Sequence, residues 1–267
     1  MSESPSWFAG YPGLRFERRD HGVLWMTIDR PEAMNATTAE MHRGLSRVWD
    51  DINDDPETRV VVVTGEGEAF SAGGDIDWIE GFVGNPDAVQ QIMREAGDLV
   101  YRMLRCEKVI ISAINGVAIG AGLAVALMAD ISLMDEDARI TDGHLRIGVG
   151  AGDHAVVCWP LLCGMAKAKY YLLTSDFLDG RTADRIGLVS KAMPGAELLA
   201  EAARLAEKLA TGPQEATRLT KRALNLWMQQ SVPAFDASLA FEMLGFLGPD
   251  VTEGVRAVRE KRRPDFD

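Results

Sequence analysis

The stretch AFSAGGDI at Ala69–Ile76, which follows the apolar run Val60–Val63, decides how this chain folds. A second stretch of the same kind, NGVAIGAG at Asn115–Gly122, follows the apolar run Val109–Ile111. Each β-branched run is typical of a buried strand, and each continues into a loop of small residues. Small side chains let backbone N–H groups approach a ligand closely, so the two loops together predict an oxyanion hole.

Outside these loops, alternating strand and helix patterns indicate an α/β fold. Residues 14–18 and 23–28 alternate like the arms of a hairpin that turns at Asp20–Gly22. Residues 38–51 carry apolar side chains at helical spacing, with Thr37 or Thr38 as the N-terminal cap. The alternation continues to about residue 190, which predicts repeated ββα units around a largely covered sheet.

The last part of the chain has only helical patterns. Apolar spacing predicts helices over 198–209, 213–228, 233–247 and 251–261. We therefore expect a core domain over 1–194 and a C-terminal helical segment over 195–267, with no linker between them. The segment has more apolar surface than it can cover alone, which favours association, and a monomer with its own helical subdomain is the alternative.

The composition is that of a globular protein and excludes several kinds of partner. The formal charge is −12, from 28 basic and 40 acidic residues among 267, which disfavours nucleic acid or an anionic membrane as partner. Cys106, Cys158 and Cys163 have no metal-ligand spacing, so we expect no metal and a reducing compartment. Residues 1–10 lack a signal-length apolar run and no run is long enough to span a membrane, so the expected location is the cytoplasm.

Several short motifs extend the pattern of the first loop. They are Arg30-Pro31, Asn35-Ala36, Ala113–Gly116, Ala129–Ile131, Gly187–Val189 and Lys221–Asn225. With the two small-residue loops, they resemble the crotonase superfamily, also called the enoyl-CoA hydratase/isomerase family. The resemblance covers the chain from about residue 14 to about residue 260.

This resemblance implies a ClpP/crotonase-like spiral of ββα units whose C-terminal helical segment serves trimerisation. It implies an enzyme, of the kind that serves fatty acid metabolism, which acts on an acyl-CoA thioester. Coenzyme A would then be part of the substrate, with no tightly bound cofactor, and the protein would be a homo-trimer or a hexamer. By the family pattern, the N–H groups of Gly74 and Ala121 form the oxyanion hole that stabilises a thioester enolate.

The family pattern also places contacts to the acyl-CoA at Ala36, Ala72, Asp75, Ile76 and Lys221. Lys221 would reach the CoA phosphates, and a solvated helix face is an equally weighted alternative. Asp is a preferred helix N-cap residue, so we expect Asp75 to cap the helix that follows it.

The acid/base residues depart from the hydratases of the family. Where hydratases keep two glutamates that hold a water, this chain has Ala124 and His144. Residues 141–154 instead contain Asp142, His144, Asp153 and His154. We expect His144 and Asp153 to form the proton-transfer pair, because a carboxylate can orient an imidazole and raise its basicity. Structural roles in the loop are the alternative, with more weight for Asp142 and His154.

Residues 141–174 also resemble a carbon–carbon bond hydrolase of the family, 6-oxocamphor hydrolase, in which the residues matching His144 and Asp153 are catalytic. A further active-site histidine of that enzyme would fall at Ala121, so the match is incomplete. We expect an acyl-CoA-processing enzyme of the hydratase/isomerase type. One alternative is a hydrolase that cleaves a β-dicarbonyl acyl-CoA by a retro-Claisen route, and another is an acyl-CoA-binding protein without catalysis.

Overall fold

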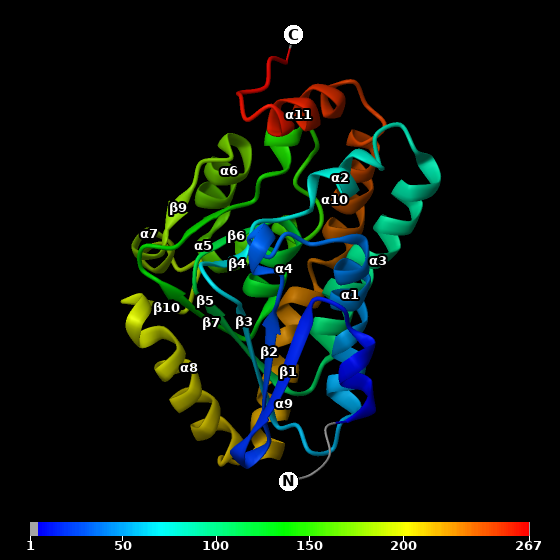
Figure 1. Cartoon of the computed structure of the whole chain (residues 1–267). Coiled ribbons are helices and arrows are strands. Elements are labelled where there is room, and N and C mark those ends of the chain that lie inside the picture. Colours follow the sequence, from blue (N-terminus) through cyan, green and yellow to red (C-terminus); the bar gives the residue numbers. More distant parts are fainter. Residues whose placement is uncertain (1–4, 267) are drawn as a thin grey trace.

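The computed structural model describes residues 5–266 and has the predicted α/β architecture, with two sheets wrapped by helices (Figure 1). The larger sheet has the order β1-β2-β3-β5-β7-β10. Its strands are β1 (Leu14–Arg19), β2 (Val23–Ile28), β3 (Val60–Gly65), β5 (Val109–Ile114), β7 (Ile131–Asp135) and β10 (Lys191–Met193). All neighbours are parallel except β1 and β2, which form the predicted hairpin.

Both faces of this sheet are covered, because successive side chains of a strand point to opposite faces. Val61 and Val63 pack into the main core under α1 (Ala39–Asp54) and α3 (Pro86–Arg105). Val60 and Val62 pack into a smaller core under α8 (Gly195–Ala210), on the other side of the sheet in Figure 1. Burial on both faces explains why β3 has an unbroken apolar sequence.

The smaller sheet has the order β4-β6-β8-β9 and carries the loops of interest. Its strands are β4 (Ala69–Ser71), β6 (Val117–Ile119), β8 (Arg139–Thr141) and β9 (Leu178–Asp179). β4, β6 and β8 run parallel, so their carboxyl ends meet at one edge of the sheet. Beyond that edge lie α2 (Ile76–Glu80), α4 (Gly120–Met128) and the 3-10 turn η4 (His144–Ile147), respectively.

Two predicted helix caps are confirmed. Thr38 is the N-cap of α1, and its hydroxyl accepts a hydrogen bond from the N–H of Met41. Asp75 is the N-cap of α2, and its carboxylate accepts from the N–H of Asp77. Arg30 also donates to Asp75, which ties the cap to the turn after β2. The remaining elements are η1 (Ser6–Gly10), η2 (Asp20–Gly22), η3 (Pro31–Ala33), α5 (Ala155–Cys163), α6 (Met165–Thr174) and α7 (Gly180–Arg185).

The C-terminal part is helical, as predicted, and consists of α8, α9 (Gln214–Gln229), α10 (Val232–Gly245) and α11 (Asp250–Arg259). α8 packs directly on the larger sheet, α10 packs on α3 and α5, and α11 packs on η4 and α2. The division at residue 195 therefore remains a prediction, since helices from both sides share one core. Within the described residues, no helix is both long and apolar enough to cross a membrane.

Candidate active site

Three loops meet at the common edge of β4, β6 and β8, because parallel strands bring their carboxyl ends together. They are 72–75, 120–122 and 142–144. The loops approach closely at Gly120, whose φ is +52° and whose missing Cβ would lie 3.7 Å from Cα of Gly73. The distance is an ordinary contact, so it is the left-handed φ that favours glycine where the second loop passes the first.

The N–H groups of Gly74 and Ala121 are both free to act as donors. The N–H of Gly74 makes no hydrogen bond to any described residue, although its neighbours pair with the Thr37 backbone. Ala121 lies in the first turn of α4, where N–H groups have no intrahelical acceptor, and no side chain caps that helix. Gly74 and Ala121 line the same pocket, and a Cβ on Gly120, the residue before Ala121, would lie 4.0 Å from N of Gly74.

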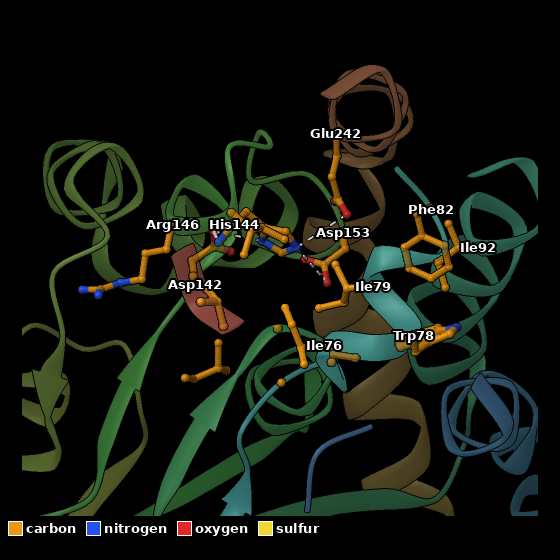
Figure 2. Close-up of a pocket in the computed structure, with 18 of the residues that line it drawn as sticks. Ile76, Trp78, Ile79, Phe82, Ile92, Asp142, His144, Arg146, Asp153 and Glu242 are labelled. Atoms are coloured by element: carbon orange, nitrogen blue, oxygen red, sulfur yellow. Dashed lines mark hydrogen bonds and ion pairs between the residues drawn. The ribbon is translucent and has the colours of Figure 1, made fainter. Parts of the chain in front are cut away.

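This pocket has a volume of about 230 Å³ and a largely apolar wall. Figure 2 shows Trp78 and Phe82 across the pocket from His144. Two other aromatic residues, Trp159 and Phe235, are wholly buried in the core and do not line this pocket. Ligand pockets typically measure ~300–1,000 Å³, so this one suits an acyl or small cyclic group rather than a nucleotide.

His144 is the central polar group of the pocket, and Asp142 orients it. Gly143 has a φ of +83° and a missing Cβ that would lie 2.7 Å from Ile119, so the turn at this position requires glycine. This turn brings Nδ1 of His144 to 3.0 Å from Oδ2 of Asp142. A carboxylate accepts there, so Nδ1 carries the proton and Nε2 faces the pocket side.

Two further carboxylates lie near Nε2 of His144 (Figure 2). Oε1 of Glu242 on α10 is 3.5 Å away, and Oδ2 of Asp153 is 3.8 Å away. The loop before Asp153 reaches α10 because Gly152 has no side chain; a Cβ there would lie 2.2 Å from the carbonyl oxygen of Ser238. Both separations exceed an ordinary hydrogen bond, and all three side chains line the pocket.

The pKa values follow from burial and from these neighbours. Burial alone would lower the pKa of His144, but Asp142, Glu242 and Asp153 outweigh it and raise this pKa well above its ordinary value. Burial raises the pKa of Glu242 to about 8, with His144 opposing and the two aspartates adding to the shift. Burial would raise the pKa of Asp153 as well, yet His154 and His144 hold it well below its usual range.

The structure thus brings His144 and Asp153 into one cluster, as predicted, but with different partners. Asp142 makes the direct hydrogen bond to His144, whereas Asp153 bonds Nδ1 of His154 at 2.5 Å. Glu242 was missed because it lies in a distant helix with no motif around it. Ala124, at one hydratase glutamate position, is buried in α4 and does not line the pocket.

Asp142, His144 and Asp153 also have ligand atoms within 4.8 Å of one another, so they could hold a cation. The bond between Asp142 and Nδ1 of His144 already accounts for one side of this group. The absence of a metal therefore stays a prediction from the sequence.

The predicted acyl-CoA contacts are divided by the fold. Ala72 and Ile76 line the pocket, whereas Ala36 and Asp75 lie beside it and bind Arg30 through the Ala36 carbonyl and the Asp75 carboxylate. The ammonium of Lys221 forms an ion pair with Oδ2 of Asp130 at 2.7 Å. Lys221 does not line the pocket. Its side chain is buried elsewhere, and Asp130 supplies the partner that a buried ammonium requires.

Comparison with known proteins agrees with this geometry. The family model for enoyl-CoA hydratase/isomerase matches residues 18–267. The chain therefore belongs to the enoyl-CoA hydratase/isomerase family, within the crotonase superfamily.

Individual relatives match more than nine-tenths of the chain. It is 34% identical to the crotonyl-CoA hydratase of Syntrophomonas wolfei, over 96% of this chain and 98% of the relative. A solved enoyl-CoA hydratase/isomerase from Mycobacterium paratuberculosis has a TM-score of 0.86 and 31% identity, over 91% of this chain and 97% of the other. A β-diketone hydrolase from Anabaena, bound to (S)-3-oxocyclohexyl acetic acid, has a TM-score of 0.85 and 29% identity, over 91% and 98% of the two chains.

Proposed function

We propose that this protein is an acyl-CoA-processing enzyme that stabilises an enolate or related oxyanion with the N–H groups of Gly74 and Ala121. The observation that carries the proposal is that two residues with available backbone N–H groups line one largely apolar pocket. Such donors stabilise charge that develops on a carbonyl oxygen without reorganising. Coenzyme A would be part of the substrate, its nucleotide outside the pocket, with further contacts at Ala72 and Ile76.

In this proposal His144 transfers the proton. Asp142 fixes its tautomer, so that Nε2 exchanges a proton with an oxygen in the part of the pocket that His144, Asp153 and Glu242 line. Water that enters this space is activated where a hydratase of the family would use its glutamates. Asp153 and Glu242 are the groups that position that water.

A second candidate is hydrolysis of a β-dicarbonyl compound, thioester or free diketone. It is favoured by the replacement of both hydratase glutamates and by the likeness to a β-diketone hydrolase. Water would give its proton to His144 and add its oxygen to one carbonyl carbon. The bond from that carbon to the central carbon would then break, its electron pair forming an enolate that is reprotonated. The products are a carboxylic acid and a ketone or thioester.

Turnover of a substrate panel tests both candidates. The panel contains crotonyl-CoA, a longer enoyl-CoA, a β-ketoacyl-CoA and a cyclic 1,3-diketone, with products identified by NMR. Hydroxyacyl-CoA or a shifted double bond supports the first candidate, and C–C cleavage supports the second. Tight binding of CoA thioesters without turnover of any member would overturn both and favour a non-catalytic acyl-CoA-binding protein.

We also propose that the protein assembles as a trimer or a dimer of trimers. α9 and α10 expose several large apolar side chains that the chain itself does not cover. They are Leu219, Leu224, Leu226, Trp227, Phe241 and Leu244. Apolar surface of this extent on adjacent helices marks an interface. Light scattering at micromolar concentration measures the mass, and a stable monomer would contradict the proposal.

A further inference from the structure

A second histidine, His42, lines the pocket away from His144. It projects from α1 and is only 4% exposed. Its ring packs at 5.1 Å from the ring of Trp78, which lies across the pocket from His144 in Figure 2. The sequence gives no hint of this placement, since His42 comes from the first long helix, outside every motif.

Glu95 on α3 fixes the orientation of His42. Its Oε2 lies 3.2 Å from Nδ1 of His42. Gln91 and Arg43 hold the other carboxylate oxygen at 3.0 and 3.4 Å. Burial would raise the pKa of Glu95, but His42, Gln91 and Arg43 bring it down to about 2. A partly buried, ionised carboxylate needs such partners, and a carboxylate that they hold in place in turn fixes the orientation of the imidazole it bonds.

The opposite ring nitrogen, Nε2 of His42, is left available. It forms no hydrogen bond with the described residues. It is also not among the fully buried polar atoms without a partner, unlike Nε2 of His154. The surrounding wall is otherwise apolar, formed by Ile79, Phe82 and Ile92 among others. A single polar atom fixed on an apolar wall is the usual way in which a pocket selects one polar atom of its ligand.

We infer that His42 is a specificity-determining residue that binds an oxygen on the acyl part of the substrate. An imidazole nitrogen pairs with a keto oxygen when it carries a proton and with a hydroxyl when it does not. The substrate class is thus a keto- or hydroxy-substituted acyl group, with one oxygen at the Gly74 and Ala121 N–H groups and another at His42. This inference rests on the proposed function for the first oxygen only.

Binding of unreactive matched ligands tests the inference separately from catalysis. One set is S-hexyl-CoA thioether and its derivatives with a ketone or hydroxyl at carbon 3, 4 or 5. The other set is cyclohexylacetic acid and 3-oxocyclohexylacetic acid. Dissociation constants are measured by calorimetry for the wild type, His42→Phe, His42→Leu and a control, His21→Phe, whose side chain is 51% exposed on the η2 turn.

In at least one set, the wild type and the control should bind an oxygenated member at least ~10-fold more tightly than its parent. This ratio should fall to about 1 in whichever His42 variant retains the wild-type fold by circular dichroism. No preference in either set, or a preference that survives loss of His42, would overturn the inference. A preference without any turnover of the earlier panel would instead retain the inference and overturn the proposed catalysis.

Discussion

Substituting Asp142 by asparagine removes the group that we propose to orient His144. The carboxylate is 1% exposed and lies 3.0 Å from Nδ1, so the bond is buried and assisted by charge. The amide preserves the shape of the side chain. It can place either oxygen or nitrogen toward the ring, and thereby loses control of the tautomer that directs Nε2 to the reacting oxygen.

The size of the effect follows from that one hydrogen bond. A hydrogen bond to a charged group contributes about 1.5–3 kcal/mol. If it acts fully in the transition state, its loss lowers kcat roughly 10- to 150-fold. The pKa of His144 also falls, because Asp142 is the main group that opposes the effect of burial on this pKa. The limb of the pH–rate profile that His144 controls should therefore move to lower pH.

The assay is steady-state turnover of the best panel substrate between pH 5 and 10, for the wild type and Asp142→Asn. Asp137→Asn is the matched control, since the Asp137 side chain is 76% exposed. We expect the control to keep the wild-type profile. A folded Asp142→Asn variant with an unchanged kcat and an unmoved pH limb would refute the assignment of His144 as the proton-transfer residue.

Other variants test the remaining assignments. Gly74→Pro removes one donor and should lower turnover by ~10²–10³-fold. Gly74→Ala is the control, because it also adds a side chain but keeps the N–H. Equal turnover by the two variants would place the oxyanion hole elsewhere. Glu242→Gln should remove any fall in rate above pH about 8, and persistence of that fall would exclude Glu242 as its cause. Lys221→Met removes the ammonium that contacts the partly exposed Asp130 carboxylate and should cost about 1–3 kcal/mol in chemical denaturation. A raised KM for CoA substrates with unchanged stability would instead support the predicted phosphate contact. Trp227→Asp should shift light scattering toward smaller species, and an unchanged mass would exclude α9 from the interface.

Local sequence was sufficient for the parts of the fold that depend on nearest neighbours. The apolar run Val60–Val63, the Thr38 cap and the Asp75 cap are each set by residues within one turn or one strand. The two small-residue loops are likewise readable, because the left-handed φ of Gly120 and the close contact of Gly122 with Ser71 restrict the residue type at these positions. These features sufficed to predict the α/β class and the two loops, whereas the choice of Gly74 and Ala121 within the loops came from the family resemblance and stays a prediction.

The partners of His144 depend on contacts between distant segments. Asp142 and Asp153 are near it in sequence, yet only the turn at Gly143 and the approach of Gly152 to α10 decide which carboxylate bonds the ring. Glu242 and His42 come from helices with no chemical motif, and Lys221 on α9 is paired with Asp130 in the turn between α4 and β7. Hydrophobic periodicity records which face of a helix is buried, but it does not record which polar residue of that face meets a cavity. That pairing is set by how the helices pack.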